Sequence, residues 1–121
     1  MNPASYFKVE YEPQAIVVTI LRDLGAVAED EMRGEWKKLI TRCEQEPPRN
    51  VIVDFGNIDY FGSVMLELLV SLGRTLKPWN GHLILCNLSE TGVEILNIAR
   101  FNTLYPITTS RQTAMALLPP N

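Results

Sequence analysis

Residues 51–66 read VIVDFGNIDYFGSVML and are the most informative stretch of this 121-residue chain. Residues 50–55 form a short, mostly apolar run, which is typical of a strand that is covered on both faces. A short loop follows. From Ser63 onwards the apolar residues recur with helical spacing, so we expect a helix over residues 63–77, ended by Pro78.

Ser63 stands where this helix is expected to begin, and two interpretations of it stay open. Serine is among the best helix-capping residues, because its hydroxyl accepts a hydrogen bond from a free N–H group of the first turn. The same place suits a phosphorylation site, since the helix dipole and the free N–H groups favour negative charge. A phosphate adds ~1.5 to 2 negative charges, which the fold would survive but an interface built on Phe61, Val64 and the loop would not.

Alternating apolar residues predict a half-buried strand at Phe7, Val9 and Tyr11, and residues 15–21 predict its hairpin partner. A helix is expected over residues 28–46. Its apolar stripe consists of Met32, Trp36, Leu39, Ile40 and Cys43. The remaining expected elements are a strand over residues 83–88, a helix from Ser89, a strand over residues 105–109 and a terminal helix capped by Ser110. We expect Ile95, Leu96, Ile98 and Ala99 to form the apolar side of the third helix.

The order of elements is β-β-α-β-α-β-α-β-α, which predicts the α/β class. We expect a mixed, mainly parallel sheet of about five strands with four flanking helices. The chain contains no repeats, low-complexity tracts or interdomain linker. It is therefore interpreted as a single domain over residues 1–121, with a core of about residues 7–118, and its length allows a substantial core.

The composition is 46% apolar and 21% charged, as in an ordinary globular protein. A net charge of -3 without a basic stripe argues against direct contact with nucleic acid. No apolar run is long enough for membrane insertion, and no secretory signal is evident. Cys43 and Cys86 form no metal-type spacing with His82, so we expect reduced, structural thiols in a cytoplasmic protein.

The sequence does not indicate a catalytic site. His82, the one histidine of the chain, is expected at the surface beside a turn, and no glycine-rich phosphate loop is present. Asp54 and Asp59 could hold a metal together, yet an aspartate at the end of a buried strand more often binds loop amides. We therefore expect no metal, no cofactor and no enzymatic activity. A small enzyme or nucleotide-binding domain that uses the two aspartates is the least favoured alternative.

The order of elements resembles a STAS domain, in particular the single-domain bacterial anti-sigma-factor antagonists, over nearly the entire chain. Residues 53–58 (VDFGNI) are similar to the family's strand and loop, apolar-Asp-Leu-Ser-x-Val. Residues 61–66 (FGSVML) fall on its apolar-Asp-Ser-Ser/Thr-Gly-Leu motif. Residues 81–107 are similar to its second Gly-x-Leu strand, the helix that follows and the short terminal strand.

The resemblance implies that Ser63 matches the serine that a partner kinase phosphorylates. In such systems the unphosphorylated antagonist binds an anti-sigma factor, which is a serine kinase of the histidine-kinase-like ATPase type, and thereby frees a sigma factor. A PP2C-type phosphatase restores the unphosphorylated form, and the antagonist itself catalyses nothing. The expected partner-binding residues are Asp59, Tyr60, Phe61, Gly62, Ser63 and Val64.

Three positions beside Ser63 depart from the family pattern, as do residues 22–25 and Arg100-Phe101. Gly62 stands where the family usually has aspartate, Val64 replaces the second hydroxyl residue and Met65 replaces the glycine. A methionine in place of glycine is bulky enough to crowd the approach of a kinase. These changes support an alternative: a STAS adaptor that is never phosphorylated, such as the small cytoplasmic subunit of a lipid-transporting ABC system, or a scaffold.

Overall fold

The structure is a computed structural model that describes residues 5–22, 29–56 and 58–119. In chain order its elements are β1 (Phe7–Tyr11), β2 (Ile16–Ile20), α1 (Glu29–Gln45), β3 (Val51–Asp54), α2 (Ser63–Leu76), η1 (Lys77–Trp79), β4 (Leu83–Cys86), α3 (Glu90–Ile98), η2 (Phe101–Thr103), β5 (Ile107–Thr108) and α4 (Arg111–Ala116). The predicted order of strands and helices is confirmed. The two 3-10 turns, η1 and η2, were not predicted, and residue 28, the predicted start of the first helix, lies outside the described residues.

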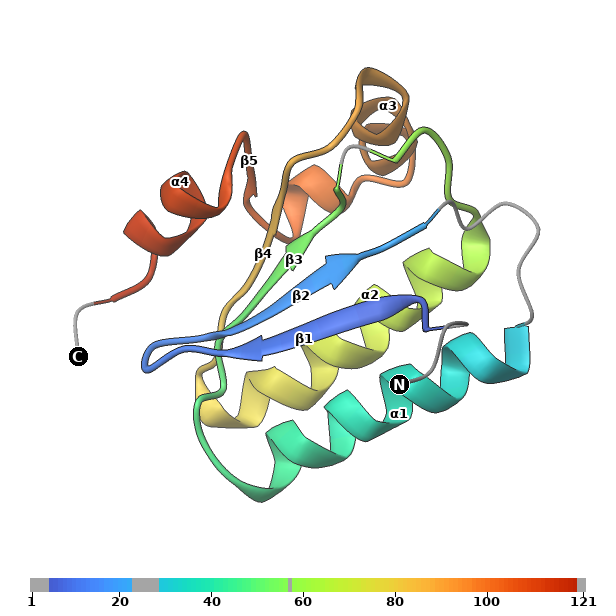
Figure 1. Ribbon diagram of the computed structural model, residues 1–121. Helices are drawn as coiled ribbons and strands as arrows, with labels where there is room; N and C mark the ends of the chain where they lie inside the picture. The colour runs from blue at the N-terminus through green and yellow to red at the C-terminus, as the bar shows by residue number, and fades with distance from the viewer. Residues whose placement is uncertain (1–4, 23–28, 57, 120–121) are drawn as a thin grey trace.

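The described strands form one five-stranded sheet in the order β1-β2-β3-β4-β5. β1 runs antiparallel to β2, and all the other neighbouring strands are parallel. The prediction of a mixed, mainly parallel sheet with four helices is therefore confirmed. Because the parallel strands β3 and β4 lie in the middle of the sheet, their carboxyl ends meet at one edge, where the loops that follow them lie close together (Figure 1).

Helices α1 and α2 lie on one face of the sheet and α4 on the opposite face (Figure 1). The apolar stripe predicted for α1 is confirmed, because its members are buried except for Ile40, which is half-buried. Trp36 anchors this helix twice. Its Nε1 donates to the Leu68 carbonyl of α2 at 2.8 Å, and its ring meets Phe7 edge-on at 5.1 Å between centroids. Helix α1 is thereby fixed to both α2 and the sheet.

A smaller apolar cluster lies under α4 on the second face of the sheet. Its buried members are Ala15, Val17, Ile52, Ile84, Cys86, Ala114 and Leu118. Because β3 and β4 are covered on both faces, every residue of these two strands is buried. This explains why their sequences are continuous apolar runs and do not alternate.

Two expectations about exposure are wrong. Phe7 of β1 is buried, but Val9 is 36% and Tyr11 56% exposed. The reason is that β1 is the edge strand, so these side chains have a neighbouring strand on one side only. Ile98, predicted on the apolar side of α3, is 84% exposed because it lies at the end of this short helix, where the chain turns away at Arg100 with a positive φ of 63°.

Candidate functional site

The loop that leads to Ser63 begins at Asp54, the last residue of β3. Asp54 Oδ1 accepts hydrogen bonds from the Gly56 N–H at 2.8 Å and from Asn87 Nδ2 at 3.0 Å, and Oδ2 accepts one from Arg111 Nε at 2.7 Å. The expectation that this carboxylate binds a loop amide is confirmed. With both oxygens engaged, Asp54 holds the start of the loop and is not free to act as one half of a metal site.

Gly56 is required at the turn that follows. Its φ is +61°, and a Cβ at this position would lie 2.8 Å from the Ile20 carbonyl oxygen. Glycine adopts this left-handed conformation most readily, and only a residue without a Cβ lets the two backbones approach so closely. The loop is therefore fixed at its first turn by the end of the neighbouring strand β2.

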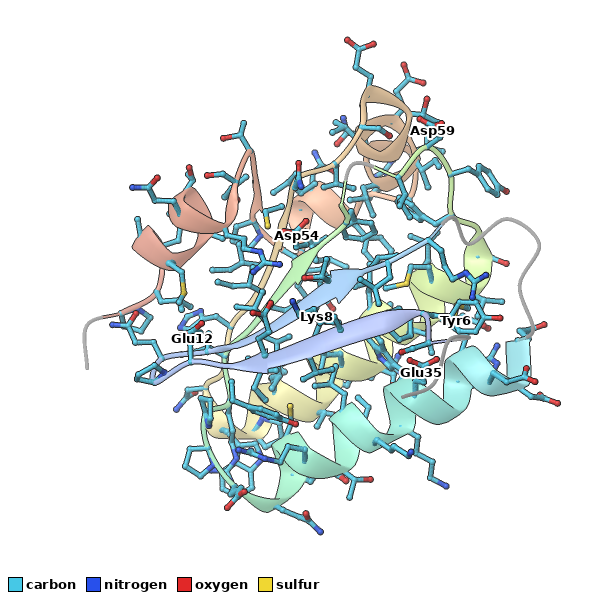
Figure 2. The ribbon with its side chains drawn as sticks, viewed as in Figure 1. Tyr6, Lys8, Glu12, Glu35, Asp54 and Asp59 are labelled. Carbon is cyan, nitrogen blue, oxygen red and sulfur yellow. The ribbon has the colours of Figure 1, made fainter. Side chains whose placement is uncertain are left out.

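The loop is closed by two phenylalanines. The rings of Phe55 and Phe61 lie 4.9 Å apart between centroids, and Phe61 is only 1% exposed. Asp59 and Tyr60 lie between them at the surface, and Figure 2 shows Asp59 on this loop between β3 and α2. Phe61 therefore packs in the core beneath the loop and fixes it there. It is not part of the exposed surface, so only its neighbours among the expected partner-binding residues can be.

Ser63 is the first residue of α2, and Gly62 occupies the capping position. The side chain of Ser63 is exposed and its hydroxyl makes no hydrogen bond with any described residue. The interpretation of Ser63 as the helix cap is therefore wrong, because the cap lies one residue earlier, at a residue without a side chain. The hydroxyl of Ser63 points to solvent and is available to another molecule.

No described side chain compensates the free N–H groups and the positive dipole at the N-terminus of α2. It has neither a capping side chain nor an acidic residue in its first turn. The other described helices have at least one of these: α1 begins with Glu29, Asp30 and Glu31, α3 is capped by Ser89, and α4 by Ser110. The predicted cap at Ser110 is thus confirmed, whereas Ser89, predicted as the start of the third helix, is its cap. At α2 the positive end of the helix dipole remains uncompensated beside an exposed hydroxyl.

The residues that depart from the family pattern occupy different environments. Met65 is 1% exposed and points into the main core, so it does not crowd the approach to Ser63, contrary to expectation. Val64 is half-buried against the core. At Gly62 a Cβ would lie 3.5 Å from the Tyr60 hydroxyl oxygen, an ordinary contact distance, so a larger residue fits there.

A groove of about 880 Å³ extends from Ser63 along the outer side of α2. Its lining residues are Glu44, Ser63, Leu66, Glu67, Val70, Ser71, Arg74, Thr75, Pro78, Trp79 and Phe101. Sequence reasoning missed this groove. The signal was present, because Leu66 and Val70 lie four residues apart and so place apolar side chains on the side of α2 that does not face the sheet.

The described residues show no arrangement that points to catalysis. They contain no group of three or more His, Cys, Asp or Glu side chains that could hold a metal ion. His82 is exposed, as expected, at the residue before β4. Cys43 and Cys86 are free and buried, and burial raises the pKa of both thiols. Within the described part of the chain, no helix is long and apolar enough to cross a membrane.

Comparison with known families agrees with this architecture. Residues 7–114 match the STAS domain family, so the chain belongs to that family. A relative named as an anti-sigma factor antagonist, BtrV of Bordetella bronchiseptica, is 32% identical over 68 residues. This alignment covers 56% of the chain and 59% of the relative, so the chain matches a little over half the length of BtrV.

Solved structures share the fold. A STAS domain protein from Planctomyces limnophilus, described as an anti-sigma-factor antagonist, is 24% identical with a TM-score of 0.76, covering 91% of this chain and 95% of that one. The anti-sigma factor antagonist SpoIIAA in its unphosphorylated form is 18% identical with a TM-score of 0.76, covering 90% and 92%. SpoIIAA of Bacillus in its phosphorylated form gives 18% and 0.67, covering 91% and 96%.

Proposed function

We propose that this protein is an anti-sigma-factor antagonist that acts as a protein-binding switch and is controlled by reversible phosphorylation of Ser63. Its partners would be an anti-sigma factor, which is a serine kinase of the histidine-kinase-like ATPase type, and a PP2C-type phosphatase, all in the cytoplasm. The protein would act by binding and by being modified, without catalysing a reaction. The observation that carries the proposal is the exposed, unbonded hydroxyl of Ser63 at the start of α2.

The surroundings of Ser63 suit a modified residue. The buried rings of Phe55 and Phe61 pack together beneath the loop, so a kinase would meet a preformed surface at Asp59, Tyr60 and Ser63. A phosphate on Ser63 would lie at the uncompensated N-terminus of α2, where negative charge is favourable. The fold would thus tolerate both forms of the protein.

Binding would be far more sensitive to the phosphate than folding. Ser63 forms one end of the groove along α2, where Leu66 and Val70 offer apolar surface to a partner. Placing about two negative charges at this rim requires a partner to desolvate them or to supply cations. Phosphorylation would therefore weaken a complex that uses this surface.

The similar proteins support the general role of an anti-sigma-factor antagonist. The relatives named above are described as anti-sigma factor antagonists, and SpoIIAA has been solved in both an unphosphorylated and a phosphorylated form. These descriptions are of those proteins. Ser63 is the reason to extend phosphorylation to this chain, because its exposed position at the start of α2 allows the same kind of modification.

The test is to isolate the protein from its own cells, grown with and without stress, and to locate phosphate by mass spectrometry of its peptides. We expect phosphate on Ser63 with an occupancy that changes between conditions. Ser71 provides a matched control, because it is an exposed serine on the same helix and lines the same groove. Ser71→Ala should leave the modification unchanged, whereas Ser63→Ala should abolish it.

The two variants also separate the proposal from its alternative, the unphosphorylated STAS adaptor. That alternative is favoured by one observation: the first turn of α2 has neither the acidic residue nor the second hydroxyl of the family motif, since Gly62 and Val64 replace them. Pull-down from cell extract should recover the kinase with Ser63→Ala and lose it with Ser63→Asp. Equal recovery with both variants, together with an unmodified Ser63, would favour the adaptor.

A further inference from the structure

Strand β1 is the edge of the sheet, and half of its backbone groups point away from β2. Hydrogen bonds join the Leu21 N–H to the Tyr6 carbonyl at 2.9 Å and the Glu12 N–H to the Ala15 carbonyl at 2.9 Å. In an antiparallel pair such bonds recur at every second residue. The even-numbered residues of β1 therefore face β2, and the N–H and carbonyl groups of Phe7, Val9 and Tyr11 face outward.

Helix α1 covers only one end of this edge. The Glu35 carboxylate accepts hydrogen bonds from the N–H groups of Tyr6, at 3.0 Å, and Phe7, at 3.3 Å, and Figure 2 shows Glu35 beside Tyr6. At the same end the Ser5 hydroxyl donates to the Phe7 carbonyl at 3.0 Å. The outward groups of Val9 and Tyr11 have no hydrogen-bond partner among the described residues. An exposed edge of this kind is a template for another strand.

The sequence of β1, FKVEY, is complementary to itself when it runs antiparallel about Val9. Lys8 would then lie opposite Glu10 of a second copy, and Glu10 opposite Lys8, so two pairs of opposite charges form. Phe7 would lie opposite Tyr11, and Val9 opposite Val9. We propose that β1 pairs in this way with β1 of a second copy of the chain, joining the two sheets around a two-fold axis at Val9.

The register of the charges agrees with the register of the hydrogen bonds. A pairing centred on Val9 sets the free N–H and carbonyl of one Val9 against those of the other. The Phe7 carbonyl accepts from Ser5 Oγ and keeps a second lone pair for the Tyr11 N–H of the other copy, whereas the Phe7 N–H stays with Glu35. A shift by one residue would bring inward-facing groups to the interface and break this match. A parallel pairing in the same register would place Lys8 against Lys8 and Glu10 against Glu10, which is repulsive.

The local environment leaves room for the second strand. A hollow of about 340 Å³ lies between β1 and α1, and Val9, Tyr11, Lys38 and Leu39 are among the residues that line it. Lys8 is exposed and forms no ion pair with a described residue, so it is free to meet a carboxylate. Glu10 is held in place by Arg111, 3.1 Å from its Oε1. The contact is small, so we expect a transient dimer populated above roughly 100 µM.

The test is sedimentation equilibrium over a range of protein concentrations. The wild-type mass should rise from 13.7 kDa toward twice that value. Val9→Pro removes an outward N–H and no bond of the β1–β2 ladder, so it should stay monomeric with its fold intact, as judged by circular dichroism. Val9→Thr, the matched control, keeps the N–H and should still dimerise.

A charge reversal tests the register without changing the backbone. Lys8→Glu sets carboxylates opposite each other and should raise the dissociation constant by about tenfold. Adding Glu10→Gln to that variant removes the opposed carboxylates while Arg111 keeps its hydrogen bonds to Asp54 and Thr19, and should recover part of the loss. The proposal is overturned if the wild type stays monomeric throughout, if Val9→Pro dimerises as well as Val9→Thr, or if the double variant is no better than Lys8→Glu.

Discussion

Arg111, the first residue of α4, donates a hydrogen bond from Nε to Oδ2 of Asp54, the last residue of β3, at 2.7 Å. The same guanidinium reaches Glu10 of β1 at 3.1 Å and the Thr19 hydroxyl of β2. One side chain therefore ties the C-terminal helix to three strands. Because Asp54 also holds Gly56, this contact links α4 to the start of the loop that leads to Ser63.

This pair predicts a pH dependence of stability. Burial alone raises the pKa of the Asp54 carboxyl, but hydrogen bonds from Arg111, Gly56 and Asn87 outweigh it and hold the pKa below its ordinary value. A carboxyl whose pKa is lower in the folded state stabilises the fold above its unfolded pKa, about 3.9, and loses that contribution as the pH falls through the folded value. We expect the free energy of unfolding to decline below about pH 4.

Asp54→Asn should remove part of that decline, and should lower the free energy of unfolding at pH 7 by about 2 kcal/mol, since the charge of Arg111 loses its buried partner. Urea unfolding at a series of pH values measures both effects. Glu46→Gln is the control, because the Glu46 side chain is 63% exposed and its pair with Arg42 should contribute little. An unchanged pH profile in Asp54→Asn would contradict the assignment.

The two tryptophans should differ sharply in their contribution to stability. Trp36→Phe removes buried volume and the hydrogen bond to the Leu68 carbonyl, and should cost about 2 kcal/mol. Trp79→Phe is the matched control, because Trp79 is half exposed and its main contact is the Arg49 guanidinium, 3.6 Å from the ring centroid. Its cost should be below about 1 kcal/mol. Similar urea midpoints for the two variants would refute this difference.

The features that the sequence predicted correctly depend on local signals. The spacing of Met32, Trp36, Leu39 and Cys43 identifies the buried side of α1 without knowledge of what covers it. The Ser110 cap likewise depends only on that residue and the turn that follows, and its hydroxyl accepts a hydrogen bond from the Thr113 N–H at 3.1 Å. Such elements, in order, were enough to predict the α/β architecture.

The features that the sequence could not settle depend on position in three dimensions. Ser63 differs from Ser89 because α2 begins one residue earlier than its serine suggests, with Gly62 extended at φ -113° and ψ -161°. The exposure of Tyr11 depends on β1 being the edge strand. Neither the start of α2 nor the position of β1 is encoded in the spacing of apolar residues, whereas the burial of Met65 does follow from the helical spacing that it shares with Leu68 and Leu72.

Both cysteines should be inert in the folded protein. Burial, followed by the nearby Asp54 charge, raises the pKa of the Cys86 thiol to about 12, and burial raises the pKa of Cys43. Reaction needs a thiolate that the reagent can reach. With a disulfide reagent at pH 8, we expect negligible labelling of the native protein and two thiols per chain in denaturant. Rapid native labelling of either thiol would show that the core opens there.

The glycine at the capping position of α2 predicts a gain in stability on substitution. The extended backbone at Gly62 suits any residue, and an added Cβ would meet the Tyr60 hydroxyl at an ordinary contact distance of 3.5 Å. Gly62→Asp supplies both a capping oxygen and a negative charge to a helix that has neither in its first turn. We expect it to raise the free energy of unfolding by about 0.5 to 1 kcal/mol.

Two further variants separate the contributions. Gly62→Asn supplies the capping oxygen without the charge and should gain less than Gly62→Asp at low salt, with the difference shrinking at high salt. Gly62→Ala supplies only the Cβ and should be the least stable of the three. If Gly62→Ala equals Gly62→Asp in urea unfolding, capping is not what this position lacks. If the predicted order holds, the aspartate usual in the family at this position stabilises the helix that presents the serine, and this chain keeps the exposed serine without that support.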